Sequence, residues 1–412
     1  MAKKNKITVD GLVLGGGIAG LQAALDLADQ GFEVLIVEKT TSIGGKMIAL
    51  SKVFPTLDCC SCICTPRMAA AAHHEDITIM TDTLLKETRR VEGGFEVILH
   101  KQPRYVDEDK CTGCRLCEYA CPVDLHHEFE GDLGARKAIY VPFSTAIPQV
   151  AVLDMDNCLL CGQCERVCPV EAVDYLQEPE EITVKAGAMI VATGFELTPI
   201  DVKSEYGGGR FRNVLSALQV ERLLSPSGPY GRVLRPSDGK VPDSIAYVQC
   251  VGSRDQSLGI TYCSRVCCMY AIKQAMLLAG SLPLVDITIY YMDIRAFGKG
   301  YEQFFQNAKS MGIEFVKAKV GKITENPDQN LNVRIEVIEE DGRVEERQHD
   351  MVVLSLGMVP GWDPEGLIPI GRDDDQFICS SQPKLAPCRT EADGIFVAGT
   401  AAGPKDIPDS IV

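Results

Sequence analysis

The chain has 412 residues, and its 41 lysines and arginines against 57 aspartates and glutamates give a formal net charge of −16. This charge argues against nucleic acid or an anionic membrane surface as a direct partner. No stretch approaches the roughly 18 consecutive apolar residues of a membrane span and no signal peptide is recognisable, so we expect a cytoplasmic protein of two or three domains.

Cysteine is the unusual component of this composition, with 18 residues. All but Cys379 and Cys388 stand in four groups, near residues 59–64, 111–121, 158–168 and 250–268. Because no secretion signal accompanies them, grouping at ligand spacing indicates metal or redox chemistry in a reducing compartment rather than a disulfide scaffold.

The first predicted elements form a βαβ unit. Residues 7–14 predict a strand, residues 21–30 a helix, and residues 31–39 a second strand that ends near Glu38. Between the first strand and the helix stands a GxGxxG fingerprint, in which successive glycines allow a tight turn, approach of the pyrophosphate and close helix packing. The helix amino terminus would bind phosphates, and Glu38 would accept hydrogen bonds from a ribose hydroxyl. The alternative is a glycine-rich turn without a nucleotide.

The next segment, DCCSCICTP, carries Cys59, Cys60, Cys62 and Cys64. It follows residues 42–46, a stretch that runs close to the cofactor in flavoproteins. A closed cluster built from cysteines so near in sequence is sterically awkward. We therefore favour a thiol-lined wall or a partner contact here, with a fourth cluster as the alternative.

Two copies of the run C-x2-C-x2-C-x3-C-P follow, the pattern of bacterial ferredoxins. The fourth cysteine of each copy binds the other cluster in such proteins. One [4Fe–4S] cluster is thus expected on Cys111, Cys114, Cys117 and Cys168, and the other on Cys158, Cys161, Cys164 and Cys121. Zinc is disfavoured, because zinc sites use paired C-x2-C motifs.

The interval between the two copies exceeds the usual ferredoxin spacing, and it predicts an extra hairpin. His126 and His127 lie in this interval. We expect both to be exposed loop residues rather than ligands.

The second half of the chain, about residues 235–350, repeats the order strand, helix, strand, helix, strand. Its first turn carries no GxGxxG and reads CVGSRDQSLGITYCSRVCC over residues 250–268. A nicotinamide site is therefore unfavourable here. On spacing alone, Cys250, Cys263, Cys267 and Cys268 fit a cluster and buried thiols about equally well.

Two later segments, residues 186–196 (AGAMIVATGFE) and 393–408 (DGIFVAGTAAGPKDIP), resemble those that complete the flavin domain in two-dinucleotide flavoproteins. FAD is therefore expected rather than NAD. In that resemblance Gly399 approaches the ribityl and phosphate side, although the acidic residue that usually follows is Thr400 here. The candidate FAD-binding residues are Gly15, Gly17, Ile18, Ala19, Gly20, Glu38, Lys39, Gly45, Lys46, Thr193, Gly194, Gly399, Lys405, Asp406 and Ile407.

The whole chain resembles the A-type subunits of heterodisulfide reductase. The resemblance rests on FPTLDCCSCICTPRM (54–68), the doubled ferredoxin run, CVGSRD…YCSRVCCMYAIKQA and GTAAGPKDIPDS. It implies a third, nonstandard [4Fe–4S] cluster on Cys250, Cys263, Cys267 and Cys268 beside the flavin. It also implies that Lys273 lies near the reactive edge of the isoalloxazine, as a catalytic residue.

The expected fold is α/β: a two-dinucleotide-binding-domain flavoprotein, thioredoxin-reductase-like and Rossmann-type, with an inserted α+β bacterial ferredoxin domain. The FAD-binding domain is expected in three parts, residues 1–103, 179–234 and 351–412. The ferredoxin-like domain is expected at 104–178, and the second Rossmann-like domain at 235–350.

Longer members of the family carry an additional amino-terminal domain and a carboxy-terminal ferredoxin domain, and we expect this chain to be a short form of the family. The short form is similar to the A-type subunits of the quinone-interacting membrane-bound oxidoreductase complexes. That resemblance implies an electron-transfer role, in which the protein relays electrons from or to a menaquinone-linked membrane subunit. The other redox partner would be a soluble protein such as adenylylsulfate reductase in dissimilatory sulfate reduction. The chain would then be held peripherally at the membrane by the quinone-reactive membrane subunit, together with a second flavin/iron–sulfur subunit.

Three alternatives remain. The first is a heterodisulfide-reductase-type subunit that performs flavin-based electron bifurcation. The second is an NAD(P)H-dependent iron–sulfur flavoprotein reductase. The third is a scaffold whose clusters are mainly structural.

Overall fold

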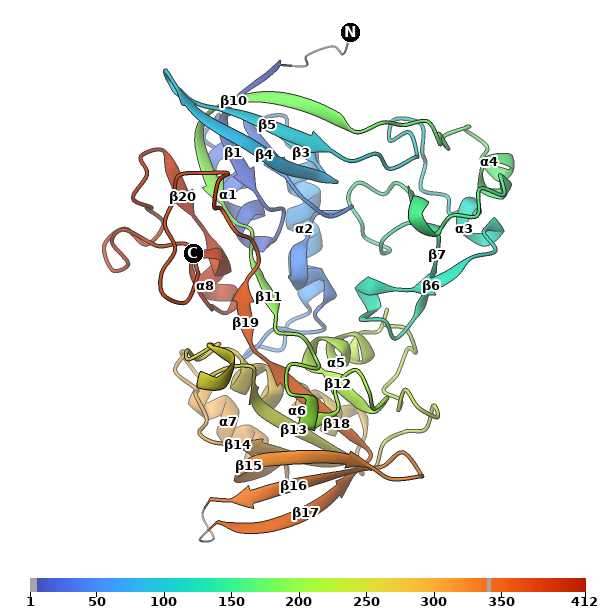
Figure 1. Ribbon diagram of the computed structural model, residues 1–412, viewed down its shortest axis with the longest axis vertical. Coiled ribbons are helices and arrows are strands. Elements are labelled where there is room, and N and C mark those ends of the chain that lie inside the picture. The colour runs from blue at the N-terminus through green and yellow to red at the C-terminus, as the bar shows by residue number, and fades with distance from the viewer. Residues whose placement is uncertain (1–5, 339–341) are drawn as a thin grey trace.

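The computed structural model describes residues 6–338 and 342–412. Residues 1–5 and 339–341, which the expected ranges 1–103 and 235–350 include, lie outside the described residues. Figure 1 shows a sheet with its helices at the top, a second sheet with its helices at the bottom, and a smaller part at the upper right.

The first sheet begins with the predicted βαβ unit. Over the described residues its strands run in the order β3-β2-β1-β10-β5-β4, with β20 paired to β10. The strands are β1 (Lys6–Leu14), β2 (Val34–Val37), β3 (Ile77–Met80), β4 (Thr83–Val91), β5 (Gly94–Lys101), β10 (Glu180–Val191) and β20 (Ile395–Val397). Neighbours among β3, β2, β1, β10 and β20 are parallel, whereas β5 pairs antiparallel with both β10 and β4.

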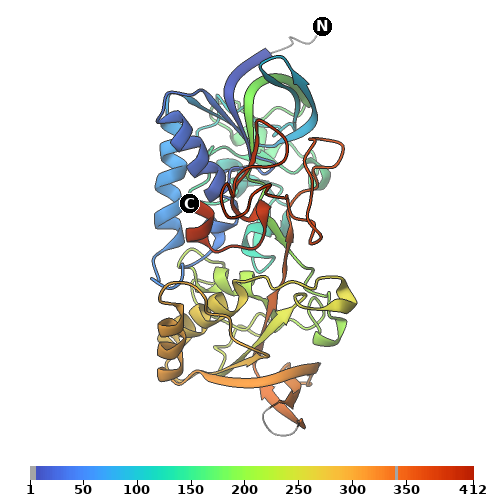
Figure 2. The same ribbon diagram turned by 90° about the vertical axis from the view of Figure 1, so that its left-hand side faces the viewer.

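Two helices, α1 (Ile18–Ala28) and α2 (Cys60–His73), lie side by side along this sheet, at the left in Figure 2. The face of α1 that carries Ile18, Leu21, Leu25 and Ala28 is buried. Strand β2 is buried at every position, as expected for a parallel strand that is covered on both faces. A short helix near the carboxyl terminus, α8 (Ile407–Ile411), contacts α1.

The second sheet follows the order β12-β18-β13-β14-β15-β16-β17 over the described residues. Its strands are β12 (Val214–Ser216), β13 (Ser244–Val251), β14 (Asp286–Tyr291), β15 (Glu314–Glu325), β16 (Leu331–Val337), β17 (Arg343–His349) and β18 (Met351–Leu356). Its helices are α5 (Ala217–Leu224), α6 (Cys267–Ser281) and α7 (Tyr301–Ser310).

Alternate residues of β13 serve two cores in this second part. Ile245 and Tyr247 pack with the helices, and Ala246 and Val248 pack on the opposite face. The predicted order strand, helix, strand, helix, strand is confirmed by β13, α6, β14, α7 and β15.

The sheets differ from the expected domain ranges at two places. Strand β12 falls in the range expected for the FAD-binding domain (179–234), and β18 falls in the range 351–412, yet both belong to the second sheet. The chain changes sheet within the antiparallel pair β11 (Phe195–Leu197) and β19 (Met358–Pro360), which joins the two parts in Figure 1. Strands β12 and β18 are short and apolar, so their own sequences do not indicate which of the two sheets they join.

The insertion, residues 102–179 between β5 and β10, is the smaller part. It contains α3 (Leu116–Ala120), α4 (Gln163–Val167), β6 (Asp124–His126), β7 (Ala135–Lys137), β8 (Ile139–Tyr140) and β9 (Val152–Leu153). The predicted extra hairpin is confirmed as the antiparallel pair β6–β7. Helices α3 and α4 contact each other.

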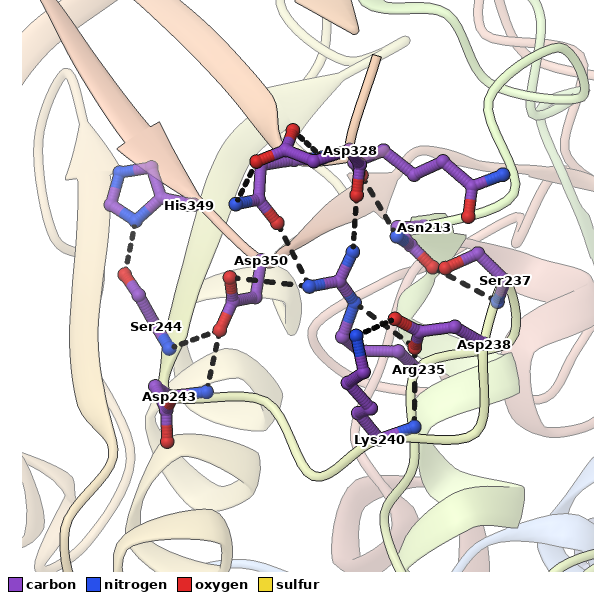
Figure 3. A network of polar contacts seen from close by, with 12 residues as sticks. Asn213, Arg235, Ser237, Asp238, Lys240, Asp243, Ser244, Asp328, His349 and Asp350 are labelled. Atoms are coloured by element: carbon purple, nitrogen blue, oxygen red, sulfur yellow. Dashed lines mark hydrogen bonds and ion pairs between the residues drawn. The ribbon is translucent and has the colours of Figure 1, made fainter. Parts of the chain in front are cut away.

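A network of polar contacts fixes the long connection between α5 and β13 (Figure 3). Arg235 donates to Asn330 Oδ1 at 2.8 Å and forms ion pairs with Asp238 and Asp350. Asp350 accepts hydrogen bonds from the backbone N–H groups of Asp243 and Ser244. The start of β13 is thereby held against the turn between β17 and β18.

Candidate functional site

The turn between β1 and α1 requires glycine at two of the predicted positions. Gly15 has φ +111°, and a Cβ there would lie 2.3 Å from the Ala192 carbonyl oxygen. A Cβ on Gly20 would lie 2.0 Å from the Gly15 carbonyl oxygen. Gly17 caps α1 without any side-chain hydrogen bond, so the first backbone N–H groups of this helix remain available to an anion.

Glu38 follows the end of β2 and is buried. Its Oε2 accepts the backbone N–H of Gly16 at 2.7 Å, and its Oε1 accepts the N–H and the hydroxyl of Thr40. The carboxylate therefore holds the glycine turn itself, a contact that the sequence did not indicate. Each carboxylate oxygen has two lone pairs, so Oε2 can still accept a ribose hydroxyl, and that role stays a prediction.

A cavity of about 820 Å³ opens from this turn and extends between the two sheets. Most of the predicted cofactor residues line it: Gly15, Gly17, Ile18, Ala19, Glu38, Lys39, Gly45, Lys46, Thr193, Gly194, Lys405, Asp406 and Ile407. Gly20 and Gly399 are not in the lining. They lie behind residues that do line it: a Cβ on Gly399, for example, would lie 2.6 Å from the Cβ of Ala19, a lining residue.

Lys273 also lines the cavity, and it is buried together with Glu221 of α5. The Lys273 ammonium forms an ion pair with Glu221 and donates to the Lys52 carbonyl oxygen at 2.8 Å. Lys273 is therefore a buried lysine and not a solvated residue of a helix surface. Glu221 was missed at the sequence level, where the only signal is a charged residue on the buried face of a short amphipathic helix.

Glu221 is satisfied as a charged group. Ser51 donates to its Oε2 from both the backbone N–H (2.9 Å) and the hydroxyl (2.6 Å), and Gln274 donates to Oε1. Burial by itself would raise the pKa of Glu221, but Lys273 and these hydrogen bonds outweigh it, and the pKa lies below its usual value. The wall of the cavity thus carries a fixed ammonium–carboxylate pair.

The helix that carries Lys273 also carries two of the cysteines of residues 250–268. Cys267 and Cys268 begin α6, and the same helix supplies Tyr270, Lys273 and Gln274 to the cavity. Burial raises the pKa of Cys267, and Cys268, Cys250 and Cys263 raise it further, so the four sulfurs share one neighbourhood. Lys273 follows Cys268 by five positions in the helix, a rise of about 7.5 Å along the axis.

The eight cysteines of the insertion fall into two groups. One small cavity is lined by Cys111, Cys114, Cys117 and Cys168, and another by Cys121, Cys158, Cys161 and Cys164. This is the crossed grouping expected from the sequence, although ligation itself stays a prediction. No three His, Cys, Asp or Glu side chains in the part of the chain that the structure describes are grouped as ligands of a single metal ion. A cubane distributes its four thiolates over separate irons, which is a wider geometry.

The insertion also contributes to the cavity between the two sheets, through His127, Phe129, Tyr140 and Phe143. His126 is exposed as expected, but the same expectation is wrong for His127, which is half-buried. Burial lowers the pKa of His127, and its Nδ1 has no hydrogen-bond partner among the described residues. Arg222 of α5 joins this surface by a bidentate pair with Glu130 (3.0 and 3.1 Å).

None of the four cysteines of residues 59–64 lines the cavity, so the expected thiol-lined wall is not observed. Cys59 and Cys62 form a disulfide at the start of α2. Cys60 and Cys64 are free and buried in the core beneath α1, four residues apart on one helix face. Burial raises the pKa of Cys60 to about 12 and that of Cys64 to about 11, so both behave as packed thiols.

The fold and the site define a flavoprotein with two Rossmann-type halves and an iron–sulfur insertion. Residues 110–173 match the 4Fe-4S dicluster domain family, and residues 13–55 match the NAD(P)-binding Rossmann-like domain family. Among solved structures, the thioredoxin reductases of T. acidophilum (TM-score 0.54, 15% identity, 98% of this chain, 94% of that chain) and Lactococcus lactis (0.55, 14%, 98%, 94%) share the fold.

The chain belongs to the family of A-type subunits of heterodisulfide reductase. It is 46% identical to the A-type polypeptide of the "H(2):CoB-CoM heterodisulfide,ferredoxin reductase" of Methanothermobacter marburgensis, over 99% of this chain and 63% of that protein. It is 49% identical to an A-type iron–sulfur subunit of the CoB–CoM heterodisulfide reductase of Methanopyrus kandleri, over 99% of this chain and 63% of that protein. The chain therefore spans less than two thirds of the length of these relatives. Within residues 6–338 and 342–412, no helix combines the length and apolar character of a membrane span.

Substitution Gly20→Ala tests whether close packing of α1 on the glycine turn is required for the cofactor. Because the new Cβ meets a backbone oxygen, the helix amino terminus must shift, at a cost of about 1–3 kcal/mol. We expect the affinity for FAD, measured by fluorescence titration of the flavin-depleted protein, to fall about tenfold or more. Gly280→Ala is the matched control, because a Cβ there meets nothing within 4 Å; equal affinities in the two variants would contradict the assignment.

Proposed function

We propose that this protein is an FAD and iron–sulfur electron-transfer subunit of a multisubunit oxidoreductase. One observation carries the proposal: a single cavity is lined by the dinucleotide turn, by the helix that begins with Cys267 and Cys268, and by the cysteine-rich insertion. A flavin in this cavity would have cysteine groups on two sides. Membership of the heterodisulfide reductase family supports the same role.

Each part of the cavity has a role in holding the flavin. The amino terminus of α1 and the glycine turn would bind the pyrophosphate, and Glu38 would accept a ribose hydroxyl. Lys405, Asp406 and Ile407 stand at the start of α8, whose helix contacts α1 beside the turn. FAD supplies, when bound, the conversion between two-electron and one-electron transfer.

Lys273 would hold a positive charge and a proton at Nζ against the flavin ring. The ion pair with Glu221 and the Lys52 carbonyl fix the position of this ammonium, so it does not reorganise when charge arrives. Aromatic residues of the insertion, among them Phe129 and Phe143 (ring centroids 4.6 Å apart), line the same cavity and give this side of it an apolar surface.

Three [4Fe–4S] clusters are proposed. The two insertion clusters would be held by Cys111, Cys114, Cys117 and Cys168, and by Cys121, Cys158, Cys161 and Cys164. The third would be held by Cys250, Cys263, Cys267 and Cys268. The match to the dicluster family supports the first two, and the shared neighbourhood of the last four sulfurs supports the third.

The partners are also proposed. Electrons would pass between a menaquinone-linked protein of the membrane and a soluble partner such as adenylylsulfate reductase in dissimilatory sulfate reduction. The protein would be cytoplasmic and held at the membrane by its partner subunits. This assignment rests on the sequence resemblance to the quinone-interacting complexes, and on the fact that the relatives are named as subunits.

A second candidate is electron bifurcation at the flavin. The name of the Methanothermobacter relative carries two acceptors, a heterodisulfide and a ferredoxin, which favours it. An NAD(P)H-dependent reductase is less well supported, because residues 250–268 replace the second glycine fingerprint. Anaerobic bleaching of the flavin by NADH would revive that alternative.

Iron analysis of the anaerobically purified protein tests the cluster proposal. Three [4Fe–4S] clusters require about twelve iron atoms per chain and one FAD. We expect Cys263→Ser to lower the iron content to about eight, because a single cluster loses a ligand. Cys379→Ser, at an exposed cysteine outside the groups, should leave about twelve. About eight iron atoms in the unaltered protein would remove the third cluster.

The ion pair between Lys273 and Glu221 predicts the direction in which each variant shifts the midpoint potential of the flavin. Lys273→Met removes a positive charge and should lower the midpoint potential, whereas Glu221→Gln leaves Lys273 unpaired and should raise it. A change of about 1.4 kcal/mol corresponds to about 30 mV for a two-electron couple. Spectroelectrochemistry of the bound flavin measures both shifts, and unchanged potentials in both variants would show that Lys273 does not face the flavin.

A further inference from the structure

The disulfide at the start of α2 is not used by the proposed electron relay. It joins Cys59, the N-cap residue, to Cys62 in the first turn of a fourteen-residue helix. The two neighbouring thiols differ from this pair, because Cys60 and Cys64 point into the core and are inert by burial. The segment therefore separates a paired, surface-facing set of sulfurs from a packed set.

The two sulfurs of the disulfide are not equivalent. Cys62 is exposed, so an incoming thiolate can reach its sulfur, whereas Cys59 is half-buried. Cys59 Sγ accepts the backbone N–H of Cys62 at 3.2 Å and lies at the positive end of the helix dipole. When the disulfide opens, negative charge on Cys59 is thus stabilised, which makes Cys59 the better leaving group.

A short antiparallel contact links this disulfide to the cavity wall. Cys59 forms a β-bridge with Lys52, and the Cys60 N–H donates to the Ser51 carbonyl oxygen at 3.2 Å. Residues 51 and 52 are also the ones that satisfy the wall pair, since Ser51 donates to Glu221 and the Lys52 carbonyl accepts from Lys273. One backbone segment therefore touches the disulfide on one side and the Lys273–Glu221 pair on the other.

We propose that Cys59 and Cys62 form a reversible thiol–disulfide exchange site for an external dithiol or disulfide, and that the state of this site is transmitted through residues 51 and 52 to Lys273 and Glu221. The exchange does not depend on the proposed function. The transmission rests on it, because its readout is the bound flavin.

The exchange is balanced in electrons and atoms. One thiolate of the dithiol attacks Cys62 Sγ, the Cys59–Cys62 bond breaks, and Cys59 leaves as a thiolate that takes up a proton. The second thiol of the partner then attacks the mixed disulfide and releases Cys62. The partner loses two electrons and two protons and becomes a disulfide, and the protein gains them as two thiols.

Peptide mapping of the intact protein under a series of glutathione redox ratios tests the exchange. The tryptic peptide of residues 53–67 contains all four cysteines of the segment. After native maleimide labelling, we expect Cys59 and Cys62 to lose their labels together as the oxidised fraction rises, with no glutathione attached, because they pair with each other. Cys60 and Cys64 should stay unlabelled until the protein is unfolded.

Cys379 is the control within the same sample, because it is a free and exposed cysteine and should carry glutathione instead. The exchange is overturned if Cys59 and Cys62 stay labelled at every ratio, if each carries its own glutathione, or if excess dithiothreitol fails to open the disulfide while Cys379 is reduced normally.

The absorption spectrum of the bound flavin tests the transmission. We expect this spectrum to differ between the disulfide and dithiol states of the unaltered protein. The control variant Cys379→Ser should show the same difference. Cys59→Ser keeps an N-cap side chain that accepts a hydrogen bond but cannot form the disulfide, so its flavin spectrum should not respond to the glutathione ratio. Identical spectra in the two states of the unaltered protein overturn the transmission and leave both the exchange result and the electron-transfer proposal standing.

Discussion

The ion pair between Lys273 and Glu221 is the interaction on which the arrangement of the cavity depends. Moving two charges out of water costs several kcal/mol per ion unless good geometry and further hydrogen bonds repay it. Here the further hydrogen bonds come from both parts of the molecule. Gln274, on the same helix as Lys273, belongs to the second part, and Ser51 and Lys52 belong to the first. The pair is satisfied only when the two parts are in contact, so the cavity between them has a defined width.

The insertion is tied to the same region by the same kind of contact. Arg222 follows Glu221 on α5, is buried, and forms a bidentate pair with Glu130 while its guanidinium lies 4.5 Å from the centre of the Phe129 ring. At the other end of the insertion, buried Arg104 donates to the Thr81 hydroxyl and pairs with Asp82 and Glu108. These contacts attach the cysteine-rich insertion at both of its ends to the parts of the chain that line the cavity.

The sequence was most informative where the chemistry is local. The glycine fingerprint and the two ferredoxin runs are recognised by the spacing of residues along the chain. In the structure Gly15 and Gly17 line one cavity, and each group of four cysteines lines a small cavity of its own. Partnerships between distant segments could not be predicted in this way. Lys273 meets Glu221 from 52 positions away and Lys52 from 221 positions away, and no local pattern encodes either contact. The division of residues 59–64 into a disulfide and two packed thiols likewise depends on which helix face meets the core.

The central claim is that a flavin lies between cluster sites on two sides, with its ring at Lys273. Crystals of the anaerobically isolated protein, measured at the iron absorption edge, test this claim most directly. We expect anomalous iron density in both cavities of the insertion and among Cys250, Cys263, Cys267 and Cys268, with the isoalloxazine beside Lys273 Nζ. A flavin whose ring lies away from Lys273, or iron in the insertion alone, would contradict it.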